Sequence, residues 1–303
     1  MTNPTPLHEQ LISTPSVSIA DTCELYQSTE SLTLLKIESP LCNAVIALQG
    51  AQLLEFTPKN SAPWLWLSPK ATFSESCPIR GGIPICAPWF GVNKQDPGKP
   101  KHGFVRTRCW QLIDAAENDI GEVELTFTCT SEERDLPLFP HPFSLNLVIR
   151  LSDHIDISFS VLNTGQSLMP FSWALHSYFN VDSLKDVRVE GLDQHPYLDA
   201  TQNFLSVIQN GSISFKSEVD RVYESVSQEQ SISGSPSLSI KGDNCPTAIV
   251  WNPGIKLATK MADITADHYD QYICLERGAA FANSWDVLPQ QSVTSTLTIL
   301  PSK

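Results

Sequence analysis

The sequence predicts an all-β fold, a sandwich or a barrel made of many short strands. Apolar and polar residues alternate with a period of two along much of the chain, which is typical of strands with one buried face. The period of amphipathic helices is nearly absent. The 22 prolines and the frequent Asn, Asp and Gly residues divide the chain into short segments joined by turns. These observations favour a sheet-based domain with few short helices.

The clearest expected strand covers residues 122–130, where apolar residues alternate with Glu and Thr. The same alternation recurs in three later segments, residues 143–151, 155–161 and 293–300. The short polar stretch Ser152-Asp153-His154 separates the first two of these segments, which indicates the turn of a β-hairpin. A helix is expected only over residues 262–269.

The length of 303 residues allows one large β domain or two smaller ones. No long flexible linker is visible, so we expect a single domain over residues 21–303, preceded by an N-terminal extension over residues 1–20. The extension lacks the basic segment and continuous apolar run of a secretory signal. No segment approaches the roughly 18 apolar residues of a membrane span. The eight cysteines occur singly, without a CxxC pair, so we expect a reduced, cytoplasmic protein. We also expect a monomer.

The net charge of −13 argues against a broad surface for nucleic acid or anionic lipid. Against this acidic background, residues 78–110 concentrate four basic side chains, Arg80, Lys101, Arg106 and Arg108. Glycines and prolines in this segment indicate a rigid loop rather than the interior of a sheet. The loop charges could simply face water, or they could form a pocket for a small anion.

Three further side chains lie in apolar segments and could carry chemistry: His176, Asp220 and Glu276. Each also has an ordinary explanation, as a core histidine, a surface pair of Asp220 with Arg221, or a pair of Glu276 with Arg277. Together with the basic loop they supply what acid–base catalysis on an anionic, polyhydroxylated ligand requires. The nucleophile motif G-x-S-x-G and a glycine-rich phosphate loop are absent, and the histidines lack the spacing of metal ligands.

The sequence resembles the glucose-6-phosphate 1-epimerases, hexose-phosphate mutarotases of the galactose-mutarotase-like, or aldose 1-epimerase, superfamily. Six motifs occur in the family's order between about Leu32 and Leu300: Arg-Gly-Gly-Ile-Pro from Arg80, His-Gly-Phe-x-Arg from His102, Ala-Leu-His-x-Tyr-Phe around His176, Val-Asp-Arg-Val-Tyr around Asp220, Trp-Asn-Pro from Trp251 and Cys-x-Glu-x-Gly around Glu276. The resemblance implies a single large antiparallel β-sandwich, a supersandwich, whose concave face binds the sugar.

The resemblance also implies roles for these residues. His176 would be the general acid and Glu276 the general base. The implied substrate contacts are Arg80, Lys101, His102, Arg106 and Asp220, although the family commonly has glutamine at position 101. At two further positions the sequence departs from the family: Arg277 replaces a proline and Gly254 a large aromatic residue, and we expect both at the rim of the site.

The expected reaction is the interconversion of the α and β anomers of a hexose 6-phosphate. Glu276 takes the proton of the anomeric hydroxyl, and His176 protonates the ring oxygen as the ring opens. A neighbouring carboxylate, with Asp220 as the candidate, would raise the pKa of the histidine or bind a sugar hydroxyl. No metal or organic cofactor is expected, and the partner is a small sugar phosphate. Two alternatives stay open, an aldose 1-epimerase for unphosphorylated sugar and a carbohydrate-binding protein without catalysis.

Overall fold

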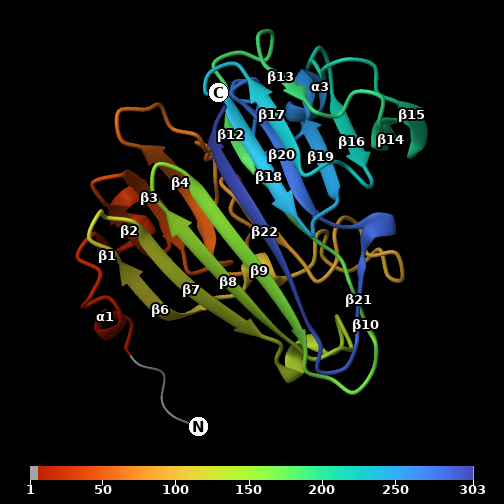
Figure 1. The fold of residues 1–303 in the computed structure, drawn as a ribbon. Coiled ribbons are helices and arrows are strands. Elements are labelled where there is room, and N and C mark those ends of the chain that lie inside the picture. The colour runs from red at the N-terminus through yellow and green to blue at the C-terminus, as the bar shows by residue number, and fades with distance from the viewer. Residues whose placement is uncertain (1–5, 303) are drawn as a thin grey trace.

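The computed structural model describes residues 6–302 and consists mainly of antiparallel strands (Figure 1). Two eight-stranded sheets form the body of the molecule. The first sheet contains, in spatial order, β13 (Arg188–Glu190), β17 (Glu229–Ser233), β18 (Leu238–Asp243), β22 (Ser292–Pro301), β9 (Ile155–Asn163), β8 (Phe143–Leu151), β7 (Val123–Thr130) and β6 (Gln111–Glu117).

The second sheet carries the motifs that resemble the epimerases. Its spatial order is β15 (Leu205–Ile208), β14 (Pro196–Asp199), β16 (Val219–Tyr223), β19 (Thr247–Asn252), β20 (Tyr272–Ala279), β11 (Trp173–Leu175) and β5 (Ile85–Cys86). Strand β12 (Tyr178–Asn180) also pairs with β20, beyond the end of β11. Strand β20 therefore lies at the centre of this sheet.

Two smaller sheets and several short helices complete the described chain. A four-stranded sheet is formed by β1 (Val17–Asp21), β2 (Thr33–Glu38), β3 (Cys42–Ala47) and β4 (Gln52–Pro58), and a two-stranded sheet by β10 (Met169–Phe171) and β21 (Trp285–Val287). The α-helices are α1 (Leu7–Gln10), α2 (Thr22–Tyr26) and α3 (Gly254–Ala258). The 3₁₀ turns are η1 (Val105–Thr107), η2 (Glu133–Asp135), η3 (Ala200–Gln202) and η4 (Phe281–Asn283).

The main core lies between the two large sheets. Along β7, β8 and β9, buried side chains alternate with partly exposed ones, as the sequence predicts for strands with one buried face. Phe159 of β9 contacts Trp173 of β11 across the core, with 4.7 Å between ring centroids. The expected β-sandwich with few short helices is therefore confirmed, as is the hairpin of β8 and β9.

The structure differs from the sequence-based expectation at residues 262–269 and at the N-terminal boundary of the domain. The helix expected over residues 262–269 is wrong, because Thr265 adopts a φ of 65°, in the left-handed region, and the segment forms turns. The expected domain boundary at residue 20 falls inside β1, which pairs with β2 along its whole length. Residues 1–5 of the expected extension lie outside the described part of the chain. That residues 21–303 form one domain stays a prediction.

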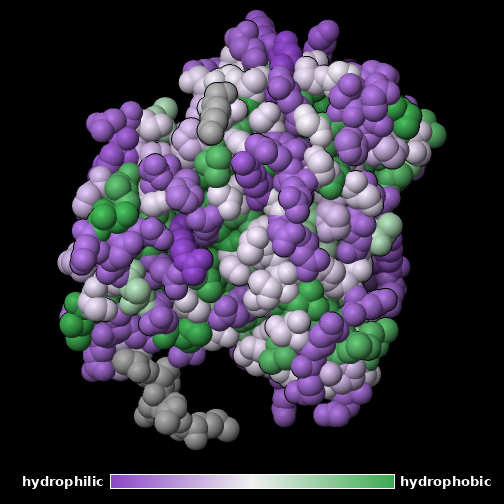
Figure 2. All heavy atoms as spheres, in the orientation of Figure 1, coloured by the Kyte–Doolittle hydropathy of each residue, from purple (hydrophilic) through white to green (hydrophobic). Residues whose placement is uncertain are grey.

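On the face shown in Figure 2, the surface is largely hydrophilic, and hydrophobic side chains lie in small, separate patches. One exposed patch belongs to the edge strand β15, where Leu205 and Ile208 are about half exposed. Within residues 6–302, no helix has the length and apolar character needed to cross a bilayer.

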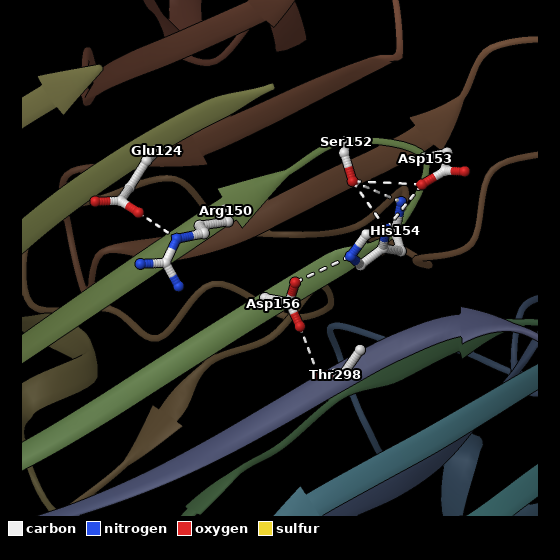
Figure 3. A network of polar contacts seen from close by, with 7 residues as sticks. All are labelled: Glu124, Arg150, Ser152, Asp153, His154, Asp156 and Thr298. Carbon is white, nitrogen blue, oxygen red and sulfur yellow. Dashed lines mark hydrogen bonds and ion pairs between the residues drawn. The ribbon is translucent and has the colours of Figure 1, made fainter. Parts of the chain in front are cut away.

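A polar network closes the hairpin of β8 and β9 (Figure 3). His154 Nδ1 lies 2.7 Å from Asp153 Oδ1, and its Nε2 lies 3.0 Å from Asp156 Oδ2. Burial alone would lower the pKa of His154, but the hydrogen bond to Asp153 and the charges of both aspartates outweigh it and raise the pKa. The native state therefore holds a proton on His154 at pH values where the unfolded chain has lost it.

This linkage predicts a pH-dependent contribution of His154 to stability. The contribution is full below the unfolded pKa, about 6.5, and disappears as the pH rises through the higher folded pKa. His154→Ala should lower the free energy of unfolding at pH 6 by less than about 1 kcal/mol, because the pair is partly exposed, and should have little effect at pH 9. Urea titrations at both pH values measure the difference. The control Glu124→Gln removes an ion pair that joins β7 to Arg150 of β8 and does not involve His154. A His154→Ala effect that is the same at both pH values would contradict the linkage.

Candidate active site

The two candidate catalytic groups meet on the second sheet. Glu276 lies on β20, and the pairing of Leu175 with Arg277 brings the end of β11 alongside it. His176 directly follows β11, and its backbone N–H donates to the carbonyl of Pro84. Both side chains are buried, and His176 Nε2 lies 3.4 Å from Glu276 Oε1. The imidazole and the carboxyl group are therefore close enough for both to reach one sugar ring.

Glu276 and Arg277 point to opposite faces of β20, because successive side chains of a strand alternate. Arg277 lies on the face toward the first sheet, is 1% exposed and donates to the backbone carbonyls of Cys245 and Gln228. The alternative that Glu276 simply pairs with Arg277 is therefore wrong. Arg277 also does not reshape the rim of the site, since it belongs to the interior.

The loop that carries the basic residues packs tightly against itself. Gly103 has a φ of 70°, and a Cβ at this position would lie 1.9 Å from the carbonyl oxygen of Ala87. The neighbouring Phe104 donates its N–H to this same carbonyl. Only glycine allows this approach, and the close contact positions the segment that carries His102 and Arg106 of the same motif.

His102 lies beside His176, with 5.7 Å between the ring centroids. Its Nδ1 accepts a hydrogen bond from the N–H of Gly91, so the proton of the neutral ring lies on Nε2. Burial lowers the pKa of His102, and the charges of neighbouring basic groups lower it further. His102 is therefore a neutral donor at the edge of the site.

The basic residues of the loop separate into three environments. Arg80 donates from Nε to Asp263 Oδ2 at 2.7 Å and from Nη1 to the Tyr178 hydroxyl at 2.8 Å. Arg108 forms an ion pair with the buried Asp135, so this member of the predicted cluster is already neutralised.

Lys101 and Arg106 form the third environment. Arg106 Nη2 donates to the backbone carbonyl of Lys101 at 2.9 Å, and its buried Nε has no hydrogen-bond partner in the described chain. Neither side chain forms an ion pair with a carboxylate of residues 6–302. These two cations are the ones best placed to hold an anionic group of a ligand.

Asp220 reaches the site from β16. It pairs with Trp251 of β19, which in turn pairs with Cys274 of β20, so the three side chains lie on the face that carries Glu276. Burial raises the pKa of Asp220 to about 6. Its charge also raises the pKa of Glu276. Asp220 therefore raises the pKa of Glu276. The expectation that it raises the pKa of His176 is wrong, because burial and the neighbouring cations lower that pKa.

Burial controls the protonation of the candidate catalytic pair, His176 and Glu276. It raises the pKa of Glu276 and lowers the pKa of His176, which the charges of Arg80, Arg106 and Lys101 lower further. In the free protein the pair therefore favours a neutral imidazole beside a protonated carboxyl group. The pair of charged groups expected from the sequence, an imidazolium and a carboxylate, holds the same number of protons. The two states differ only in whether one proton lies on Glu276 Oε1 or on His176 Nε2, 3.4 Å away.

Sequence reasoning missed two residues that contact the site from outside the catalytic pair. Tyr178 lies in the motif around His176, but only the structure shows its ring stacked on the imidazole. Asp263 has no sequence signal, because it lies in the turn segment expected to be a helix and is 183 residues from its partner Arg80. In the part of the chain described, no group of three or more His, Cys, Asp or Glu side chains is arranged to hold a metal ion.

The profile of the aldose 1-epimerase family matches residues 33–299. The chain belongs to the aldose 1-epimerase family. Two relatives carry the name "Putative glucose-6-phosphate 1-epimerase": one from Salmonella typhimurium is 33% identical, covering 87% of this chain and 86% of the relative, and one from Cenchrus ciliaris is 34% identical, covering 78% and 75%. A solved structure from S. typhimurium, described as "a putative mutarotase (YeaD)", has a TM-score of 0.86 at 29% identity and covers 96% of this chain and 95% of its own.

These findings confirm the family that the six sequence motifs indicate. The protein is an epimerase whose substrate is a sugar, and it shares its all-β fold with the solved mutarotase structure.

The raised pKa of Asp220 predicts that this epimerase becomes more stable when the group cannot ionise. The folded pKa of about 6 exceeds the ordinary value of 3.8, so ionised Asp220 costs stability above about pH 6, and this cost falls between pH 6 and 4. Asp220→Asn should raise Tm at pH 7.5, by about 2–4 °C for each kcal/mol of cost removed, and the gain should shrink toward pH 4.

Asp199 on the neighbouring strand β14 provides a control of opposite sign. Burial opposes ionisation there too, but hydrogen bonds from Thr201 and Gln202 outweigh it and lower the pKa. Asp199→Asn should therefore lower Tm at pH 7.5. Calorimetry of both variants across pH measures the two effects, and a lower Tm of Asp220→Asn at pH 7.5 would contradict the account of Asp220.

Proposed function

We propose that this epimerase interconverts the α and β anomers of a hexose 6-phosphate, with glucose 6-phosphate as its substrate. The observation that carries the proposal is the buried pair of His176 and Glu276, 3.4 Å apart, beside two cations, Lys101 and Arg106, that have no carboxylate partner in the described chain. The names of the relatives support the same substrate class.

The reaction follows from one proton shared by the pair. With the proton on His176, the carboxylate of Glu276 accepts the proton of the anomeric hydroxyl while the imidazolium protonates the ring oxygen, and the carbon–oxygen bond of the ring breaks. The open aldehyde rotates about the bond next to the carbonyl carbon. Ring closure reverses both transfers, so the pair returns to its starting state. A second proton on the pair, or loss of its single proton, stops the cycle, so activity should show a bell-shaped pH profile.

The remaining candidate residues bind the substrate in this proposal. Arg106 and Lys101 hold the phosphate through charge-assisted hydrogen bonds, with Arg80 as a further contact. His102 donates from Nε2, and Asp220 binds a sugar hydroxyl next to Glu276. A monomeric, cytoplasmic protein that binds no nucleic acid stays a prediction from the sequence.

Substitution of either member of the pair tests the proposed acid–base roles. His176→Ala and Glu276→Gln should each reduce anomer exchange of glucose 6-phosphate by at least about 10²–10⁴-fold, the usual contribution of positioned proton transfer. Saturation-transfer NMR measures exchange directly. Circular dichroism and Tm of the same samples show whether each variant is folded. Wild-type exchange in either folded variant would overturn the assigned roles.

Substitution of the two cations tests whether they bind the phosphate of the substrate. Lys101→Gln combined with Arg106→Ala should lower kcat/KM for glucose 6-phosphate by about 100-fold or more, because hydrogen bonds to charged groups contribute about 1.5–3 kcal/mol each. Exchange of free glucose and galactose should change little. The matched control is Lys59→Gln, which removes an exposed lysine that binds Asn43 on the small sheet.

Three results separate the proposed substrate from the alternatives. Acceleration of glucose 6-phosphate alone by the wild-type protein supports the proposal. Equal acceleration of free sugars, with no effect of the double substitution, would establish a general aldose epimerase. Binding of sugar without faster exchange of any of them would leave a carbohydrate-binding protein.

A further inference from the structure

The imidazole of His176 lies at the end of a stack of aromatic rings. Its plane is 8° from that of Tyr178, with 4.8 Å between centroids. Tyr178 stacks in turn on Trp66 at 5.9 Å, and Trp66 stacks on Tyr272 at 4.2 Å. All four rings belong to buried residues. The stack therefore constrains the plane of the catalytic imidazole.

This constraint matters because the usual anchor of a catalytic histidine is missing. The ring nitrogen that does not face the substrate is ordinarily held by a carboxylate or a backbone carbonyl. In residues 6–302, no other residue forms a hydrogen bond to His176 Nδ1, although this atom is buried. The orientation of the ring must therefore come from packing, and Tyr178 supplies the face on which it rests.

Tyr178 is itself fixed at both ends. Its backbone N–H donates to the carbonyl of Gly82, and its carbonyl accepts from the N–H of Trp66. At the other end its hydroxyl accepts a hydrogen bond of 2.8 Å from Arg80 Nη1. Rotation of the ring away from His176 would break the contact with the guanidinium.

Asp263 holds the guanidinium in turn. Its Oδ2 accepts from Arg80 Nε at 2.7 Å, and both side chains are partly buried. The backbone of Asp263 is tied down as well, because its carbonyl accepts a hydrogen bond of 2.6 Å from the Ser68 hydroxyl. Two of the donor groups of Arg80 are therefore committed to the protein and only the remainder can face a ligand.

We propose that Asp263 and Tyr178 are positioning residues for the epimerase reaction: Asp263 orients Arg80, Arg80 holds the hydroxyl of Tyr178, and the ring of Tyr178 sets the plane of His176. Arg80 then serves the histidine as much as the substrate. This inference rests on the proposed function, since it assigns how the proposed general acid is aimed.

We call the contacts that lead from Asp263 through Arg80 and Tyr178 to His176 the relay. The relay also places a compensating negative charge, that of Asp263, near His176. The titratable and charged groups that face the imidazole are Glu276, His102, Tyr178, Arg80, Arg106 and Lys101. Asp263 neutralises one of the three cations in this set. Without its carboxylate, the full charge of Arg80 would oppose protonation of the imidazole.

Tyr178→Phe tests the positioning step with the least structural damage. The variant keeps the ring and its stack but loses the hydroxyl that anchors it. We expect kcat for glucose 6-phosphate to fall by about 10- to 100-fold, as for other small misplacements of a catalytic group, while KM changes less than kcat. A folded Tyr178→Phe variant with wild-type kcat would overturn the proposal.

Asp263→Asn tests the charge of the relay. The amide is similar in shape but leaves Arg80 uncompensated, so we expect kcat to fall and the acidic limb of the pH profile to move to lower pH. Asp263→Glu restores a carboxylate and should recover part of kcat and return the acidic limb toward its wild-type position. An unchanged pH profile of Asp263→Asn would contradict the role assigned to its charge.

Asp135→Asn is the matched control, because it removes the carboxylate of another buried ion pair, with Arg108, that does not contact His176. It should lower Tm without moving the pH profile. The test also separates this inference from the proposed function. Full activity of His176→Ala would contradict the proposed function. An inactive His176→Ala together with a fully active Tyr178→Phe would leave the proposed function intact and contradict the positioning role of Tyr178.

Discussion

The site depends on one constraint, the burial of an ionisable glutamate on a central strand. Strand β20 is buried along its whole length, and Glu276 and Arg277 lie side by side in it while pointing to opposite faces. The arginine is satisfied by backbone carbonyls of the interior. The glutamate is left with a buried oxygen that has no hydrogen-bond partner in residues 6–302. Burying such a group is costly, and a group of this kind is available to accept or release a proton when a substrate arrives.

The protonation of the pair follows from the same burial. A carboxylate and an imidazolium both lose hydration in this position, so the free protein favours the arrangement in which neither is charged. Lys101 and Arg106 favour the ionised form of Glu276, but burial outweighs them there, and both cations oppose a charged His176. In the proposed mechanism, the charged arrangement is one proton transfer away and forms where the sugar hydroxyl and ring oxygen provide new partners.

The sequence predicts the sheets well because their signal is local. Alternating residues define β7, β8 and β9 without reference to distant parts of the chain, and an isolated glutamate in an apolar strand already points to a special environment. The pairing of charges is not local. Nothing near Arg108 predicts that Asp135 neutralises it, and nothing near Arg80 predicts Asp263. Of the four basic residues clustered in the sequence, only Lys101 and Arg106 lack a carboxylate partner within residues 6–302. The direction of the His176 pKa shift was mispredicted because it is set first by burial and then by the charges of Arg80, Arg106 and Lys101, none of which the sequence around His176 reveals.

The two candidate catalytic groups share a further property that links the fold to the chemistry. His176 Nδ1 and Glu276 Oε2 are both buried without a hydrogen-bond partner in the described chain. A permanent partner would fix the proton on one group, whereas an epimerase must pass it back and forth as the ring opens on one face and closes on the other. Orientation then has to come from contacts that do not compete for the proton. Aromatic stacking meets this requirement, because the face of Tyr178 restrains the imidazole without bonding to either nitrogen. The polar contacts that fix the site accordingly lie one residue further out, between Arg80, Asp263 and the Tyr178 hydroxyl. There they position the aromatic stack without binding the proton that the pair shares.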